Sequence, residues 1–145
     1  PSIVLLQDSD PIPGYGAFWG EVQSNVHKGL GCVGTVTDGS IRDIPDCAEG
    51  FQLLAKMEAP SHAYVHTVEM DVEITVAGMT VKPGDLVHAD RQGAVVIPSA
   101  DVARKVPETA DLISRREAVL IGASQKPGFD FDKLVKAIGD ASEIH

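Results

Sequence analysis

Short apolar runs separated by turn-forming stretches dominate the first part of this chain. Residues 3–6 are apolar and mostly β-branched or leucine, which predicts a buried strand. Residues 32–36 predict a second buried strand, and residues 37–40 (Thr-Asp-Gly-Ser) predict a turn after it. The apolar spacing of residues 51–57 fits neither a helix nor a strand cleanly, and we favour a strand.

A proline- and glycine-rich stretch lies between the first two predicted strands. Residues 11–16 are expected to form a loop, and a helix is expected to open at Gly20 and Glu21 and to run to about Gly29. Arg42 and Asp43 should then follow the carboxyl end of the second strand, beyond the predicted turn. Ligands of α/β proteins favour that kind of edge.

The next part of the chain alternates apolar and polar residues, as half-buried strands do. Residues 63–76 show this alternation, and Ala77-Gly78 should turn the chain. Residues 82–85 (Lys-Pro-Gly-Asp) are a candidate type II turn, followed by strands at residues 86–89 and 93–97. Short, turn-linked strands are therefore expected here.

Two helices are predicted at the end of the sequence. Ser99 is a candidate N-cap for a helix that begins at Ala100, ends near Ile121 with Gly122 as its C-cap, and is interrupted or kinked by Pro107. Residues 129–138 place four apolar residues at the spacing of one helix face: Phe131, Leu134, Val135 and Ile138.

Composition narrows the class of protein. With 145 residues, of which 43% are hydrophobic, the chain is expected to form one domain over residues 1–145. Its net charge of -9 would repel a phosphate backbone or an anionic membrane, so nucleic acid and membrane are not expected partners. Cys32 and Cys47 are too few for a disulfide scaffold, and no apolar stretch approaches the roughly 18 residues of a membrane span. We therefore expect a cytoplasmic protein.

The candidate chemistry lies at two ends of predicted elements. The helix N-terminus at residues 16–21 offers unpaired backbone amides and a positive dipole end to a small carboxylate or carbonyl oxygen. Arg42 adds a bidentate clamp. Asp43 and Glu21 are hard oxygen ligands suited to Mg²⁺ or Mn²⁺. Together these residues predict a site for an anionic 2-oxo acid.

Three blocks in this order resemble the RraA-like family, which includes the class II pyruvate aldolases. They are residues 14–21 (GYGAFWGE), residues 34–43 (GTVTDGSIRD), and residues 81–90 (VKPGDLVHAD) with the VVIP of residues 95–98. The resemblance covers roughly residues 3–121. It implies a swivelling β/β/α domain of the α/β class, similar to phosphohistidine domains, assembled as a homotrimer or homohexamer.

The resemblance also implies roles for individual residues. Asp43 would be the direct ligand of a divalent metal, Mg²⁺ or Mn²⁺. Glu21 would act through metal-bound water, and Arg42 would hold the substrate and stabilise enolate charge. Glu117 would complete the metal shell from a neighbouring subunit. The loop residues that would contact substrate are Gly16, Ala17, Phe18, Trp19 and Gly20.

The implied reaction is retro-aldol cleavage or decarboxylation of a small 2-oxo acid to pyruvate. Family members act on 4-hydroxy-4-methyl-2-oxoglutarate, 4-carboxy-4-hydroxy-2-oxoadipate and oxaloacetate, whereas others inhibit RNase E. A non-catalytic regulatory binder and a related hydratase or isomerase are therefore alternatives. Family members usually carry a further segment before the first strand of this chain, so whether the chain is a fragment is left open.

Other site interpretations are less favoured. His62 and His66 are four residues apart, but the local pattern indicates a strand, so we do not predict zinc. The glycines at 14, 16 and 20 have the wrong spacing for a dinucleotide-binding fingerprint. No lysine is placed to argue for a Schiff base, although Lys28, Lys56 and Lys82 are not excluded.

Overall fold

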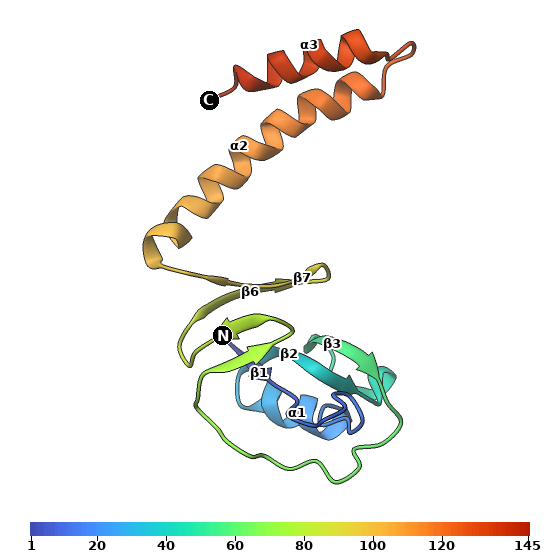
Figure 1. Cartoon of the computed structure of the whole chain (residues 1–145), viewed down its shortest axis with the longest axis vertical. Helices are drawn as coiled ribbons and strands as arrows, with labels where there is room; N and C mark the ends of the chain where they lie inside the picture. Colours follow the sequence, from blue (N-terminus) through green and yellow to red (C-terminus); the bar gives the residue numbers. More distant parts are fainter. The chain divides into compact units, whose positions relative to one another are not determined.

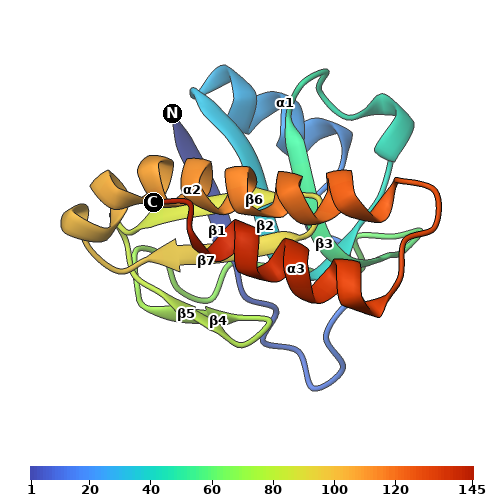
Figure 2. The ribbon, with the colours of Figure 1, turned by 90° about the horizontal axis from the view of Figure 1, so that it is seen from above.

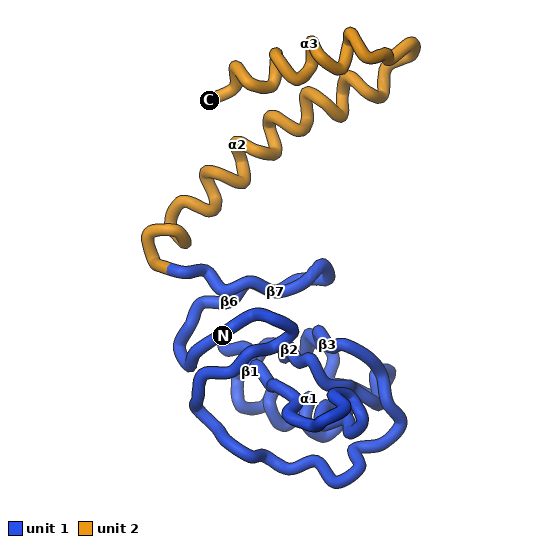
Figure 3. The backbone as a smooth tube through the Cα atoms, in the orientation of Figure 1, with its two compact units in different colours: residues 1–98 blue, residues 99–145 orange.

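The computed structural model describes residues 1–145 and consists of two compact units (Figure 3). The first comprises Pro1–Pro98 and the second Ser99–His145. The expectation of a single domain over the whole chain stays a prediction.

A three-stranded parallel sheet forms the centre of the first unit (Figure 1). Its strands are β1 (Ser2–Leu6), β2 (Cys32–Ile41) and β3 (Gln52–Glu58), with β2 in the middle. Helix α1 (Glu21–Gly29) follows β1 and packs against β2. The predicted helix and strands are confirmed, including the strand favoured at residues 51–57, and the chain belongs to the α/β class as expected.

The turn predicted at residues 37–40 is wrong, because β2 continues through these residues to Ile41. The strand tolerates its turn-forming residues through an irregularity in the pairing with β3 between Thr37 and Ser40. Asp38 accepts the backbone N–H of Asp8 at 2.7 Å, so its side chain ties β2 to the segment after β1. Asp38 therefore has a structural role.

The core of this unit is a cluster around Trp19, against which residues of all three strands pack. Trp19 is fully buried, and its ring centroid lies 5.6 Å from that of Phe51. Ile41 and Ala48 complete the buried cluster. A single parallel bridge joins Trp19 to Ile41, so the segment before α1 is held against the end of β2.

The rest of the first unit is built from two hairpins. β4 (Ile74–Val76) pairs with β5 (Met79–Val81) across Ala77 and Gly78, which both have positive φ, as the predicted turn requires. β6 (Leu86–Asp90) pairs with β7 (Gly93–Ile97). Gly84 has φ +87°, and the N–H of Asp85 donates to the carbonyl of Lys82 at 3.1 Å, which confirms the turn at residues 82–85.

Residues 63–73 differ from the expectation of an alternating strand. They form no strand, and side chains such as Val68 and Met70 are more than 70% exposed. Only the end of the alternating stretch, at β4, finds a pairing partner. Alternation by itself does not satisfy backbone hydrogen bonds, so without a neighbouring strand this segment stays irregular.

The second unit is a pair of helices, α2 (Ala100–Ser124) and α3 (Phe131–Ser142), that lie side by side (Figures 1 and 2). Ser99 caps α2 by accepting the N–H of Val102 at 3.2 Å, as predicted. Gly122 is not the C-cap, because α2 continues to Ser124 and ends at Gln125. The helix also runs through Pro107 without a break.

Helix α3 confirms the predicted final helix but buries a different face. Ala137 and Ala141 are its buried residues, whereas Phe131, Val135 and Ile138 are at least half exposed. Small side chains allow α3 to approach α2 closely, which explains why alanines occupy the contact. No helix in the structure combines the length and the apolar character that crossing a membrane requires.

Candidate functional site

Arg42 is held in place immediately after the end of β2. Its backbone N–H donates to the carbonyl of Trp19 at 2.9 Å. Its Nη1 donates to the carbonyl oxygens of Ala17 and Phe18, the latter at 3.3 Å. The side chain is only 14% exposed. Residues 14–20, here called the glycine loop, and the Arg42 side chain therefore form one unit, in which the guanidinium has little conformational freedom left to lose when a ligand binds.

Asp43 presents its carboxylate beside that guanidinium. Its Oδ2 lies 3.2 Å from Arg42 Nε, and its side chain is 43% exposed. The backbone of Asp43 is left-handed, with φ 54° and ψ 33°, and it precedes the short 3-10 helix η1 (Ile44–Asp46). The side chain makes no capping hydrogen bond to η1, so the carboxylate is bound only by Arg42 and stays open to solvent.

Gly20 is in close contact with both charged residues. A Cβ atom on Gly20 would lie 2.8 Å from Asp43 Oδ2 and 2.9 Å from Arg42 Cγ. The φ of Gly20 is -168°, an extended conformation that any residue adopts. A glycine is therefore required here because the Arg42 and Asp43 side chains occupy the space of a Cβ atom, and not because of the backbone angles.

The side chains of the other residues predicted for the site make no hydrogen bond or ion pair with Arg42 or Asp43. Glu21 opens α1 directly after Gly20 and is exposed, and no hydrogen bond or ion pair joins its carboxylate to Arg42 or Asp43. Trp19 and Ala17 are fully buried, so their side chains are structural, whereas their loop supplies the carbonyls that hold Arg42. Glu117 is an exposed residue of α2 in the second unit, and its role stays a prediction.

A hollow of about 400 Å³ opens beside Arg42 and Asp43. Besides these two residues and Ile41, it is lined by Ile44 and Pro45 of the segment after β2 and by Glu58, Ala59 and Pro60 at the end of β3. Its size suits a small organic acid. Glu58 was not predicted as a site residue. Its position at a strand end was the available signal, but only the pairing of β2 with β3 places it beside Arg42.

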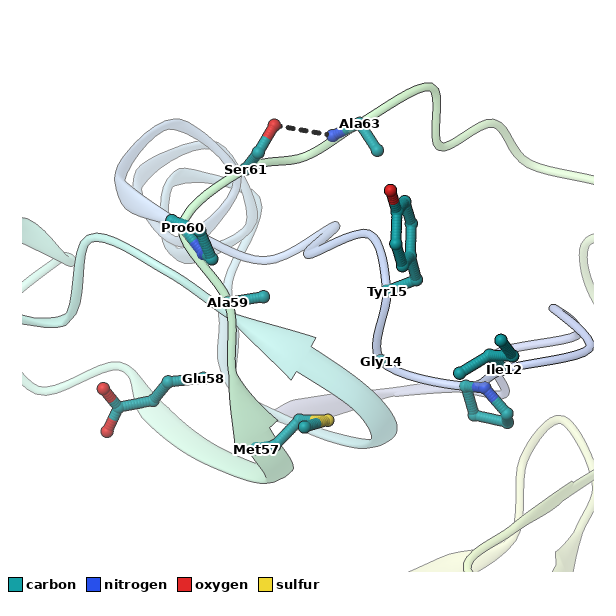
Figure 4. A pocket seen from close by; sticks show the side chains of 10 residues that line it. Ile12, Gly14, Tyr15, Met57, Glu58, Ala59, Pro60, Ser61 and Ala63 are labelled. Atoms are coloured by element: carbon teal, nitrogen blue, oxygen red, sulfur yellow. Dashed lines mark hydrogen bonds between the residues drawn. The ribbon is translucent and has the colours of Figure 1, made fainter.

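A second hollow of about 500 Å³ shares Glu58, Ala59 and Pro60 with the first (Figure 4). Its other lining comes from the loop before α1, including Ile12 and Tyr15, from Met57 of β3, and from Ser61 and Ala63 after β3. Figure 4 shows the Glu58 side chain pointing away from Met57 and Tyr15. Glu58 lines both hollows, but only the hollow beside Arg42 also contains the charged pair Arg42 and Asp43.

The donor set at Asp43 fits a hard divalent cation of the kind that keeps most of its waters. Mg²⁺ is often held by one or two carboxylates and by oxygens of the substrate. Asp43 offers one half-exposed carboxylate next to a hollow with room for water and substrate. The structure brings together no group of three or more His, Cys, Asp or Glu side chains that could hold a metal ion. His62 and His66 therefore belong to no such group. A metal bound here would depend on few protein ligands.

The chain is similar to known proteins over most of its first unit. A family model described as RraA-like, Aldolase/RraA, matches residues 2–96. An uncharacterised protein of Methanocaldococcus jannaschii is 33% identical over 103 residues, which are 70% of this chain and 49% of that protein. A protein of Albidiferax ferrireducens named "Putative 4-hydroxy-4-methyl-2-oxoglutarate aldolase" is 33% identical over 69 residues, 46% of this chain and 39% of its own length. The chain thus spans about half, or less, of these relatives.

Solved structures show the same fold. An uncharacterised Pseudomonas syringae protein matches with a TM-score of 0.72 at 24% identity, covering 95% of this chain and 63% of that one. Streptomyces coelicolor RraAS2, described as an unusual member of the RNase ES inhibitor RraA family, matches with a TM-score of 0.65 at 29% identity, covering 79% and 59%. The RNA-processing inhibitor RraA of Thermus thermophilis matches with a TM-score of 0.56 at 25% identity, covering 67% and 59%.

Proposed function

Because this chain belongs to the RraA-like family of aldolases and RraA proteins, we propose that it is a divalent-metal-dependent lyase for a small 2-oxo acid. The observation that carries the proposal is the Arg42–Asp43 pair, in which a fixed guanidinium adjoins an open carboxylate at the edge of a hollow of about 400 Å³. Candidate substrates are 4-hydroxy-4-methyl-2-oxoglutarate and oxaloacetate, and pyruvate is the expected product.

The reaction breaks the bond between C3 and C4 of the substrate. Its electron pair goes to C3 and forms the enolate of pyruvate, which then takes a proton at C3. In retro-aldol cleavage the C4 hydroxyl group loses its proton and becomes the carbonyl of the second product. In decarboxylation of oxaloacetate, C4 leaves as carbon dioxide. Both reactions therefore need positive charge beside the oxygen on C2.

Arg42 supplies such charge from the protein. Its Nη1 and Nε are engaged by the glycine loop and by Asp43, whereas no hydrogen bond or ion pair engages Nη2. Nη2 would donate to the substrate's carboxylate or to its C2 oxygen, and the protein carbonyls would keep the guanidinium from moving as charge develops. Glu21, exposed at the start of α1, would accept the hydroxyl proton through water.

Asp43 would hold the divalent cation, with Glu21 contributing through water and Glu117 of a neighbouring subunit as a further proposed ligand. When bound, the cation would supply additional positive charge for the oxygen that becomes negative. The proposed assembly into trimers or hexamers rests on the family resemblance, as does Glu117.

Asp43→Ala tests this proposal. With Mg²⁺ or Mn²⁺ present, we expect the unaltered protein to release pyruvate from oxaloacetate or 4-hydroxy-4-methyl-2-oxoglutarate, and we expect the variant to lose at least about 100-fold in kcat/KM. Chelation of the metal should abolish turnover in the same way. Asp46→Ala is a matched control, because Asp46 contacts Asp43 only through its backbone N–H. No pyruvate from any 2-oxo acid with either metal would reject the lyase.

A regulatory binder is the second candidate. The similarity to two solved RraA proteins and the net charge of -9 favour it, because an acidic surface suits a basic segment of a partner. We would measure inhibition of RNase E by the purified protein at several salt concentrations. Salt-sensitive inhibition without pyruvate release would establish this candidate, and turnover without inhibition would exclude it.

A further inference from the structure

The hollow beside Arg42 contains a carboxylate that the proposed reaction does not use. Glu58 is the last residue of β3 and pairs with Ile41, the last residue of β2, so both strands end at the same level.

 This pairing extends one residue further, since the N–H of Ala59 donates to the carbonyl of Ile41 at 3.0 Å. Glu58 therefore lies on the edge of the sheet that also carries Arg42 and Asp43, and it lines the same hollow.

The charges around this hollow are unbalanced. Arg42 is the only cation in its lining, whereas Asp43 and Glu58 are both carboxylates. Two of the three nitrogens of the Arg42 guanidinium already have protein partners. One substrate carboxylate can pair with Arg42, and a cation held by Asp43 would be bound by the 2-oxo group, so a second carboxylate at the far end of the molecule would meet Glu58, which has no ion-pair partner.

The rest of the lining is apolar or weakly polar. Ile44 is 42% exposed, and Pro45, Ala59 and Pro60 add further carbon surface. Such a surface favours the far end of a substrate that carries no charge, because an unpaired carboxylate loses hydration there without gaining a partner.

We propose that Glu58 is a specificity-determining residue that selects 2-oxo acids with a single carboxylate and an uncharged, apolar far end. This inference rests on the proposed function, because it assigns the hollow to a 2-oxo acid bound through Arg42. It narrows the substrate class: dicarboxylic acids such as 4-hydroxy-4-methyl-2-oxoglutarate become poorer substrates than their monocarboxylic counterparts.

The test compares two acids of equal length that cannot undergo retro-aldol cleavage, 2-oxopentanoate and 2-oxoglutarate. We would measure their dissociation constants by calorimetry with Mg²⁺ present. In the unaltered protein we expect 2-oxopentanoate to bind about fivefold more tightly, and this ratio should fall as salt is added. In Glu58→Gln the ratio should fall close to one, mainly through tighter binding of 2-oxoglutarate.

Glu69→Gln is the matched control. Glu69 is exposed, lines neither hollow and has no ion-pair partner, and its replacement changes the net charge by the same amount. The control should keep the ratio of the unaltered protein. Equal affinity for the two acids, or a ratio that Glu58→Gln leaves unchanged, would overturn the role of Glu58.

Pyruvate release separates this inference from the proposed reaction. It would be measured in parallel from 4-hydroxy-4-methyl-2-oxopentanoate and 4-hydroxy-4-methyl-2-oxoglutarate. A Glu58-dependent binding ratio without pyruvate release would reject the lyase and keep the selectivity of the hollow. Pyruvate release with a preference for the dicarboxylic acid would keep the lyase and reject the selectivity. Failure of both 2-oxo acids to bind would overturn both.

Discussion

Single residues at this site are constrained mainly by their neighbours in space. Arg42 is engaged by two carbonyls of the glycine loop and by Asp43, so its position depends on residues more than 20 positions earlier in the chain. Gly20 shows the same dependence, because its missing side chain leaves the space that Arg42 and Asp43 occupy. The geometry of the pair is therefore sensitive to a single methyl group.

Gly20→Ala should reduce pyruvate release by about 10- to 100-fold, because the new Cβ would displace the Asp43 carboxylate and the Arg42 side chain. The extended backbone at Gly20 accepts alanine, but the mostly buried Arg42 side chain would have to shift, so the melting temperature should also fall. Steady-state kinetics and thermal unfolding measure the two effects.

Gly29→Ala is the control for that substitution. A Cβ at Gly29 would meet no atom within 4 Å, and alanine favours a helix over glycine. We expect full activity from this variant. A Gly20→Ala protein that is equally active would show that the Arg42–Asp43 geometry does not limit the reaction.

Among the elements, helix α3 depends on a charged cap. Asp130 accepts the backbone N–H of Lys133 at 2.9 Å and pairs with Lys133 Nζ at 3.0 Å. Two contacts lower the pKa of Asp130 below its ordinary value of 3.8. The backbone hydrogen bond has the larger effect and the side-chain contact with Lys133 the smaller one. Because both contacts favour the ionised carboxylate, the start of α3 is coupled to pH.

The start of α3 should therefore fray in acid. A lowered pKa in the folded state means that the cap's stabilisation is complete above pH 3.8 and is lost as the pH falls through the folded pKa. Amide hydrogen exchange at Lys133 should accelerate in that range relative to amides in the middle of the helix.

Asp130→Asn provides the comparison, since asparagine also caps helices but does not titrate. Its exchange at Lys133 should lack the additional acid-dependent step. If both proteins show the same dependence on pH, the ionised carboxylate is not what holds the start of α3.

At the scale of the whole molecule, the match to the family model and the Arg42–Asp43 pair belong to the first unit. The family model ends at residue 96, close to the end of that unit at Pro98. Most of the acidic excess of the chain also lies in residues 1–98. The stability of the first unit depends on one small cluster around Trp19, which is the only tryptophan of the chain.

Phe51→Ala should lower the free energy of unfolding of the first unit by about 3 kcal/mol or more, because it removes a buried ring that packs against Trp19. Urea unfolding followed by Trp19 fluorescence reports this unit directly. Val33→Ala, at a 44% exposed position of β2, should cost less than about 1 kcal/mol. Equal losses from the two substitutions would show that the cluster does not dominate stability.

Local patterns in the sequence were enough to predict α1, the strands of the parallel sheet and the cap at Ser99, because short-range preferences and burial agree there. They were also enough to single out Arg42 and Asp43, which are neighbours in the chain.

Contacts between residues far apart in the sequence decided the rest. β2 continues through Asp38 and Gly39 because its pairing with β3 resumes at Ser40 after the irregularity, and residues 63–73 form no strand because nothing pairs with them. The placement of Glu58 beside Arg42 follows from the register of β2 with β3, which is set by contacts between residues far apart in the sequence.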